Sequence, residues 1–474
     1  MTTTRTTRTT EREHALATTL RETITGDVID RDDPRHDEAR RVWNGLVDRH
    51  PAVVARCRGT DDVVAAVAAA RRHRPPVSIR GGGHQVAGSA ICDDGLVIDV
   101  SGMSTVTVDP VSRTARVGAG ARWADVNAAT TPHGLAVPGG EVSETGVAGL
   151  TLGGGLGQLQ RAFGLSCDAL RSLEIVTADG MVRTASPTEH ADLFWAARGG
   201  GRGIGVVTAF EFALFPLGPD VAHSLVLYPY EDAASVLRAW RDLAVGAPET
   251  VSPEFALWSI PPDPGFPAEM HGAPVVVVAG LHAGPAEDGI EALAPLAQLG
   301  TPLVDVTGVS DYATSQTGSD PLFPSGARYF FKSHFLDRLD DDAAAAVLAA
   351  DRGRPTPQSL VIVRTLGGAI DRVGADASAY AHRGARFNVS IDAGWTDPAL
   401  DATAIGWARR GWESLRPFAT GGMYVNFAGL DDDADRTATF GAHAARLDAI
   451  ARTYDPDGIL AAAGARHEAG PRPS

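Results

Sequence analysis

The residues whose types could do chemistry gather first between Pro76 and Gly88. Three consecutive glycines, Gly81 to Gly83, follow an apolar run there, and His84 comes directly after them. Because glycine has no Cβ, the backbone N–H groups of such a loop can converge on an anion at close range. His84 would then lie beside whatever the loop holds. A glycine-rich turn with a surface histidine is the alternative, and this stretch alone does not separate the two.

Two more glycine clusters follow, at residues 146–157 and 198–205. Apolar residues interrupt the first of these, so it does not have the composition of a flexible linker. No Gly-Lys-Ser/Thr follows any of the clusters, which argues against a Walker loop, and the GxGxxG spacing with its acidic partner is also missing. Together the three clusters indicate a long, flat, charged ligand held largely by backbone, such as a dinucleotide bound by a fold other than the Rossmann fold.

Short predicted elements surround the glycine clusters. Strands are predicted at residues 52–56, 77–80, 96–100, 106–108, 114–117, 172–176 and 209–215, and helices at 13–24, 60–72 and 123–131. After about residue 216 the pattern changes to strands at 224–228, 254–258, 274–279, 302–306, 360–363 and 387–391, with helices at 233–243, 289–296, 341–350, 407–415 and 441–453. The second half therefore predicts a large sheet with helices on one side.

Composition excludes several classes of function. A net charge of −16 over 474 residues argues against a nucleic-acid partner, because binding a phosphate backbone needs a basic face. Cys57, Cys92 and Cys167 form no CxxC pair, so we expect small core residues and no metal site. The N-terminus has no signal-like segment, and no uninterrupted apolar run reaches about 18 residues. We therefore expect a cytoplasmic protein without a membrane partner.

A set of motifs, in this order along the chain, carries a resemblance to a known family. They are Arg80-Gly-Gly-Gly-His84 with Gly88, residues 96–101, Gly146–Gly157, Gly164–Asp168, Val176–Gly180, Asp192–Gly201, Tyr424-Val-Asn426 and Tyr454-Asp-Pro456. The chain resembles the berberine bridge enzyme-like FAD-linked oxidoreductases of the para-cresol methylhydroxylase/vanillyl-alcohol oxidase superfamily. The similarity runs from about residue 40 to 465.

Residues 1 to about 12 are rich in Thr and Arg, and this composition predicts disorder. Together with the α+β fold that the resemblance implies, this gives four parts. These are a partly disordered N-terminal tail (1–27), a two-lobed FAD-binding domain of the vanillyl-alcohol oxidase type (28–215), a substrate-binding domain with an antiparallel sheet flanked by helices (216–420), and a C-terminal segment that completes the FAD domain (421–474). The resemblance also implies that His84 bonds covalently to the 8α-methyl carbon of the flavin. The FAD-binding residues it implies are Arg80, Gly81, Gly82, Gly83, His84, Gly88, Thr145, Gly146, Gly149, Gly153, Gly154, Gly155, Gly157, Val207 and Asn426.

Two positions bear on how the flavin would be attached and reoxidised. Many members of the family carry a second covalent link from a cysteine, and the matching position here is Val142. We therefore predict one covalent bond, through His84 only. Thr145 occupies the place where a side chain influences oxygen access in this family.

The catalytic base is the main departure from the family pattern. Many members end the motif Tyr-x-Asn-Tyr with a tyrosine that acts as the base or its relay, whereas this chain has Phe427. Strand alternation places Asn388, Ser390 and Asp392 on one face, and Asn388 matches an active-site glutamate or glutamine of some relatives. The candidates are therefore Tyr424, Asn388 and Asp392. His334 is a further candidate, although a lone histidine is more often structural.

From these features we expect an FAD-dependent oxidoreductase, an oxidase or a dehydrogenase, that abstracts a hydride from a small molecule. The expected substrate is a secondary metabolite of polyketide, phenolic or alkaloid type, with dioxygen as acceptor. The alternatives are an oligosaccharide or alcohol oxidase, a non-redox or redox-neutral cyclase or isomerase on the same flavin fold, and a flavoprotein that sequesters a metabolite. The sequence does not predict an oligomeric state.

Overall fold

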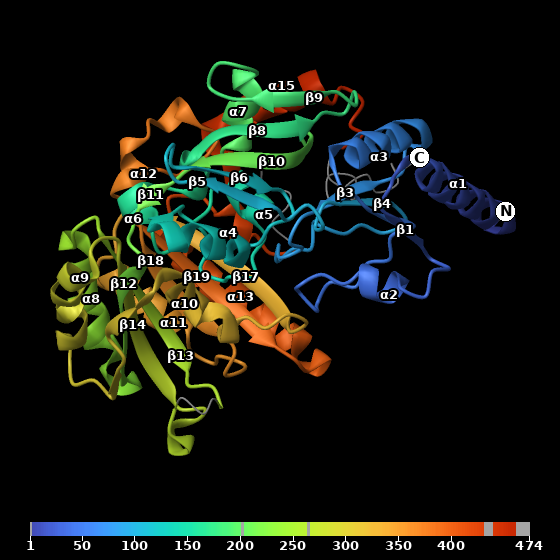
Figure 1. The fold of residues 1–474 in the computed structure, drawn as a ribbon. Helices are drawn as coiled ribbons and strands as arrows, with labels where there is room; N and C mark the ends of the chain where they lie inside the picture. The colour runs from blue at the N-terminus through green and yellow to red at the C-terminus, as the bar shows by residue number, and fades with distance from the viewer. Residues whose placement is uncertain (1, 201–202, 263–265, 431–438, 461–474) are drawn as a thin grey trace.

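Three β-sheets organise the chain, two from residues 27–213 and a larger one from residues 220–395 (Figure 1). The structure is a computed structural model that describes residues 2–200, 203–262, 266–430 and 439–460. Gly201, the last residue of the predicted motif 192–201, and residues 461–474 of the predicted C-terminal segment lie outside the described residues.

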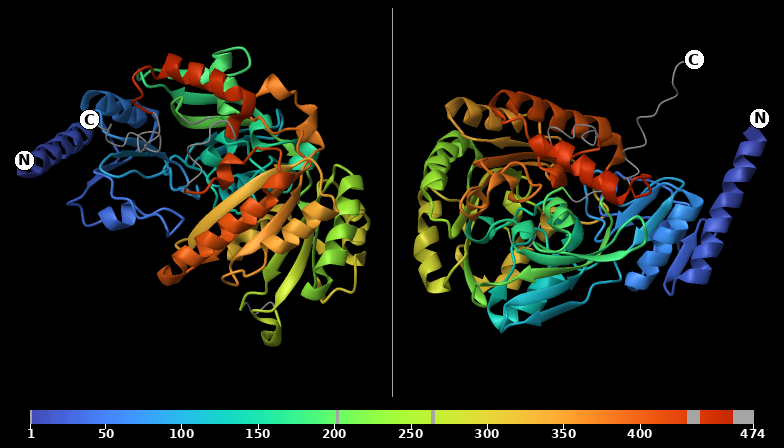
Figure 2. Two further views of the ribbon diagram at one scale, coloured as in Figure 1. Left: turned by 180° about the vertical axis from the view of Figure 1, so that it is seen from behind. Right: turned by 90° about the horizontal axis from the view of Figure 1, so that it is seen from above.

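The first sheet is small and partly parallel. Its order is β1 (Asp27–Asp30), β2 (Val53–Arg56), β4 (Leu96–Asp99) and β3 (Val77–Arg80), with β4 parallel to both β2 and β3. The helices around it are α1 (Thr2–Thr23), α2 (His36–Ala39) and α3 (Thr60–His73). α1 stands at one edge of the molecule beside α3 (Figure 2). Residues 2–12 form the first half of α1, and the expected disorder of the N-terminal tail stays a prediction.

The second sheet is antiparallel. Its order is β5 (Val106–Asp109), β6 (Thr114–Gly118), β10 (Val206–Ala213), β8 (Leu170–Val176) and β9 (Val182–Ala185). Beside it lie the short pair β7 (Leu135–Ala136) and β11 (Phe215–Pro216) and the helices α4 (Trp123–Thr130), α5 (Val147–Leu152), α6 (Gln160–Phe163), α7 (Ala191–Ala197) and α15 (Ala444–Tyr454).

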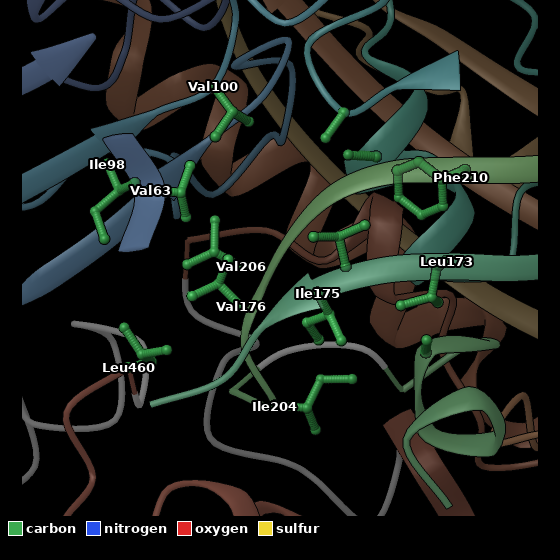
Figure 3. Close-up of a cluster of buried hydrophobic side chains, with 14 of the residues drawn as sticks. Val63, Ile98, Val100, Leu173, Ile175, Val176, Ile204, Val206, Phe210 and Leu460 are labelled. Carbon is green, nitrogen blue, oxygen red and sulfur yellow. The ribbon is translucent and has the colours of Figure 1, made fainter. Parts of the chain in front are cut away.

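One apolar core joins the first two sheets to the end of the described chain. Figure 3 shows Ile98 of the first sheet, Ile175 and Phe210 of the second, and Leu460 within this cluster. All four side chains are at most 2% exposed. The cluster also includes Leu447 of α15, so residues more than two hundred positions apart in sequence complete the same core.

The third sheet is antiparallel and longer. Its order is β15 (Val304–Asp305), β12 (Asp220–Pro229), β14 (Pro274–His282), β13 (Val251–Ser259), β18 (Leu360–Thr365), β19 (Phe387–Trp395) and β17 (Arg328–Leu336), with β16 (Gly308–Asp311) beside β12. The helices of this part are α8 (Ala233–Gly246), α9 (Ala286–Leu293), α10 (Tyr312–Gln316), α11 (Asp341–Ala350), α12 (Ala369–Arg372) and α13 (Asp401–Leu415).

Alternation along β19 gives this sheet two different faces. Phe387, Val389 and Ile391 pack in the cluster that contains side chains of α8, α11 and α13. Asn388 and Asp392 point to the opposite face, as period-two alternation requires. The predicted α+β class, with an antiparallel sheet flanked by helices, is confirmed. None of the helices within the described residues is long and apolar enough to cross a membrane.

Candidate functional site

A large cavity lies between the glycine loops and the helix-free face of the third sheet. It encloses about 1780 Å³ of space that no protein atom occupies, part of it open to solvent. Its lining is of two kinds. Backbone of the glycine loops forms one part, and aromatic and charged side chains of the third sheet and its neighbouring loops form the other.

Most of the residues predicted to hold FAD line this cavity. They are Gly81, Gly82, Gly83, His84, Thr145, Gly146, Gly149, Gly153, Val207 and Asn426. Val142, the position without the second cysteine, lines it as well. Arg80, Gly88, Gly154, Gly155 and Gly157 do not contribute to the lining. The guanidinium of Arg80 instead donates to the buried carboxylate of Asp99 and to the carbonyl oxygen of Ala39. Its side chain therefore anchors the glycine loop to neighbouring backbone and does not line the cavity.

The glycines allow close approach between backbones and leave space in the cavity. A Cβ on Gly82 would lie 2.5 Å from the Cα of Gly146, so the two loops touch through backbone alone. A Cβ on Gly149 would meet no protein atom within 4 Å, and Gly149 lines the cavity. A side chain there would occupy the space that the cavity offers to a ligand.

His84 lies in an aromatic stack. The Trp43 ring lies between the rings of His84 and Tyr329, at centroid distances of 4.2 Å and 4.0 Å. Within the described residues, the buried Nε2 of His84 has no hydrogen-bond partner. Burial lowers the pKa of His84 to about 4, so the imidazole is neutral near pH 7. A neutral imidazole nitrogen without a partner is available as a nucleophile.

These observations fit FAD. The Gly82–Gly146 contact and the open space at Gly149 provide a backbone cradle for a flat dinucleotide, since glycine lets the backbone approach a ligand closely. His84 places an unpartnered nitrogen at the cavity wall.

A buried group of charged side chains lines the other part of the cavity. Arg364 of β18 donates to both carboxylate oxygens of Glu141, at 2.7 Å through Nε and 2.8 Å through Nη2. Its Nη1 donates to Ser390 Oγ at 2.9 Å. The Ser390 hydroxyl donates to Oδ2 of Asp392 at 3.0 Å. Oδ1 of Asp392 has no hydrogen-bond partner among the described residues.

The ionisation of these groups follows from burial and from Arg364. Burial raises the pKa of Asp392 to about 7, although the Arg364 charge and the Ser390 hydrogen bond oppose this. Burial also disfavours the charged form of Glu141, but Arg364 outweighs it and holds the Glu141 pKa below its ordinary value. Asp392 therefore changes protonation near neutral pH, as a general base must, while Glu141 stays ionised.

Aromatic side chains surround the carboxyl of Asp392. Phe331 of β17 lies directly opposite Asp392 in the strand pairing, and Phe427 lies 6.3 Å from Phe331 between ring centroids. The Arg364 guanidinium lies over the Phe427 ring at 4.8 Å. Phe427 therefore covers the cation and adds no proton-accepting group.

The other predicted bases occupy different surroundings. The hydroxyl oxygen of Tyr424 accepts hydrogen bonds from the backbone N–H groups of Gly155 and Leu156 and from the Asn426 side chain, and burial raises its pKa to about 12. Asn388 is fully buried and does not line the cavity. His334 stacks on Trp412 of α13 and bonds to its carbonyl oxygen, on the helix-covered face.

Sequence reasoning missed Trp43, Glu141 and Arg364. One signal was available for Arg364, because a charged residue interrupts the apolar strand Leu-Val-Ile-Val-Arg-Thr, and buried charges are usually paired. Trp43 lies in a stretch dominated by charges. Glu141 lies in a loop without a recognisable pattern, so no local signal marks it.

Comparison with known proteins gives matches over most of the chain. Residues 51–186 match the family model described as an FAD binding domain. Uncharacterized FAD-linked oxidoreductase YgaK of Bacillus subtilis (strain 168) is 29% identical over 448 residues, which cover 92% of this chain and 96% of the relative.

Two solved structures superpose over nearly their full lengths. BBE-like 1 of Physcomitrella patens aligns with a TM-score of 0.84 at 23% identity, covering 94% of this chain and 97% of that one. The 6-hydroxy-D-nicotine oxidase of Arthrobacter nicotinovorans aligns with a TM-score of 0.79 at 25% identity, covering 92% and 97%.

Proposed function

Because the chain belongs to the vanillyl-alcohol oxidase/para-cresol methylhydroxylase family of FAD-linked oxidoreductases, we propose that it oxidises a small, largely apolar ring compound with Asp392 as the base. One observation carries this proposal. Asp392 lines the cavity, its Oδ1 has no hydrogen-bond partner within the described part of the chain, and its pKa is about 7. We propose a secondary metabolite of phenolic, polyketide or alkaloid type as the substrate.

The proposed reaction takes one proton and one hydride from the substrate. A hydroxyl of the substrate loses its proton to Oδ1 of Asp392, while the adjacent carbon loses a hydride and the carbonyl product forms. A bound FAD supplies the acceptor of that hydride, and we propose dioxygen as the oxidant that regenerates it. Thr145 lines the cavity at the position through which we expect oxygen access to be influenced.

The aromatic walls support an apolar substrate over an oligosaccharide. Phe323, Phe331 and Phe427 line the cavity near Asp392 and carry no hydrogen-bonding group. An oligosaccharide would lose hydrogen bonds to water without replacement there, which is costly. A fused or single ring with one hydroxyl would instead bury apolar surface against these side chains.

We further propose that FAD is bound covalently, through His84 alone. The new bond would join an imidazole nitrogen to the 8α-methyl carbon at the expense of one C–H bond and the imidazole N–H bond. Two protons and two electrons would leave, and dioxygen would take them up as hydrogen peroxide. Trp43 and Tyr329 support this by holding the His84 ring in a fixed plane.

Replacing His84 with alanine will abolish acid-stable flavin. Wild-type protein precipitated with acid will keep its yellow colour in the pellet, whereas His84→Ala will release all flavin into the supernatant. The exposed His133, which does not line the cavity, provides the control, since His133→Ala will behave as the wild type. Acid-stable flavin in His84→Ala would contradict the assignment.

Anaerobic mixing with candidate substrates tests the proposed reaction. We expect the flavin absorption band to bleach with apolar cyclic or benzylic alcohols, whose carbinol carbon carries a hydrogen, and to persist with oligosaccharides of similar size. Bleaching by oligosaccharides alone would overturn the substrate class. A product formed without bleaching would favour a redox-neutral cyclase, and tight binding without a product would favour sequestration.

A further inference from the structure

Two carboxyl groups meet behind Arg364. Glu254 of β13 lies opposite Arg364 of β18 in the strand pairing, and its carboxyl is in hydrogen-bond contact with that of Glu141. Two ionised carboxylates have no hydrogen to share. The contact therefore requires a proton on one of them. Glu141 already accepts two hydrogen bonds from Arg364, so the proton belongs to Glu254.

The charges of the surrounding groups agree with that assignment. Burial, followed by the charge of Glu141, raises the pKa of Glu254 well above its ordinary value. The Arg364 side chain is 2% exposed and that of Glu141 is 14% exposed, so little bulk water screens the pair. A neutral Glu254 adds no second negative charge next to Glu141.

We propose that Glu254 is a positioning residue that holds a proton between itself and Glu141 and thereby keeps Arg364 paired with Glu141 instead of with the base Asp392. Arg364 reaches Asp392 only through the hydroxyl of Ser390. Asp392 is thus left without a cation of its own. Part of the inference, the effect on Asp392, rests on the proposed function, whereas the protonation of Glu254 does not.

The charged and aromatic groups described around Asp392 enter this balance. Arg364 of β18 is the positive group, Glu141 of the loop after β7 is the negative one, and Glu254 of β13 is neutral. Phe331 of β17 and Phe427 face Asp392 without charge. If glutamine replaced both Glu141 and Glu254, Asp392 would be the sole carboxylate partner of Arg364 in this group. An opposite charge lowers a carboxyl pKa by about one to three units.

Infrared spectra of the flavin-loaded protein, recorded against pH without any substrate, test the proposal. We expect two protonated-carboxyl bands in the wild type, one that disappears as the pH rises through about 7 and one that persists at higher pH. Asp392→Asn will remove the first and Glu254→Gln the second. In Glu141→Gln/Glu254→Gln the titration of Asp392 will move down by about one to three pH units. Glu254→Gln alone will leave it in place, because the neutral glutamine amide can donate a hydrogen bond to Glu141 as a protonated Glu254 does.

Thermal unfolding gives an independent measurement. The pKa of Glu254 is higher in the folded state than in the unfolded state. The wild type therefore loses stability as the pH rises above the unfolded-state pKa of Glu254. Glu254→Gln has no such proton, so its melting temperature will exceed that of the wild type by a margin that widens from about pH 5 to pH 8. Parallel pH profiles, a persistent band in Glu254→Gln, or an unmoved Asp392 titration in the double variant would each overturn the proposal. None of these readouts depends on finding a substrate.

Discussion

Asp392→Asn will hold FAD as the wild type does but will reduce it with substrate about 10²- to 10⁴-fold more slowly, the usual contribution of a positioned base. The amide keeps the size of the carboxyl and can still accept the hydrogen bond that Ser390 donates at 3.0 Å. It cannot take a proton at the position of Oδ1. Anaerobic stopped-flow measurement of flavin bleaching gives the rate directly.

The pH dependence separates this loss from a general disturbance of the site. Because Asp392 must be deprotonated to act, the wild-type rate will fall as the pH drops through about 7, and Asp392→Asn will show no such limb. Tyr424→Phe is the comparison, since Tyr424 also lines the cavity. If Asp392→Asn kept the wild-type rate of flavin reduction and Tyr424→Phe lost most of it, the base would be Tyr424 and not Asp392.

Gly149→Ala will weaken FAD binding without unfolding the protein. The added methyl meets no protein atom within 4 Å and enters the cavity instead. Filling well-packed space costs about 1–3 kcal/mol, which corresponds to a dissociation constant about 5- to 150-fold higher. The measurement belongs in the His84→Ala background, where binding of FAD is reversible, with fluorescence quenching as the signal.

A second glycine supplies the control for Gly149→Ala. Gly246 ends α8, is exposed and likewise has no protein atom within 4 Å of an added Cβ, but it does not line the cavity. Gly246→Ala will leave FAD affinity unchanged. An unchanged affinity in Gly149→Ala would mean that bound FAD does not pass over Gly149.

Local patterns in the sequence predicted much of the third sheet, because its strands alternate between a helix-covered face and a cavity face. The register of β19 with β18 and β17 places Asn388, Ser390 and Asp392 on one face, as the alternation predicts. β17 itself was not predicted as a strand. β17 is buried on both faces, and Lys332 and His334 lie among its apolar residues on the helix side. Its sequence therefore shows no simple alternation of polar and apolar residues.

The parts that could not be predicted depend on contacts between distant segments. α5 lies within a glycine-rich stretch predicted as loop, because glycines flank the helix on both sides and glycine has a low helix propensity. Burial of Val147, Ala148 and Thr151 stabilises it nevertheless. The Glu141–Arg364–Glu254 group joins a loop and two strands, and neither residue spacing nor periodicity encodes that pairing.

The stack of His84, Trp43 and Tyr329 has a consequence for the order of folding. Asn44, next to Trp43, bonds to the backbone of Tyr329, 285 residues away along the chain, and Trp43 itself bonds to Phe323. Contacts of such long sequence separation form late, because the entropy of closing the intervening chain must be overcome first. The wall that holds His84 is therefore complete only after the third sheet has docked. If FAD bonds to His84 as proposed, the chain can react with FAD only once this wall has formed, and the covalent bond would mark chains that have finished folding.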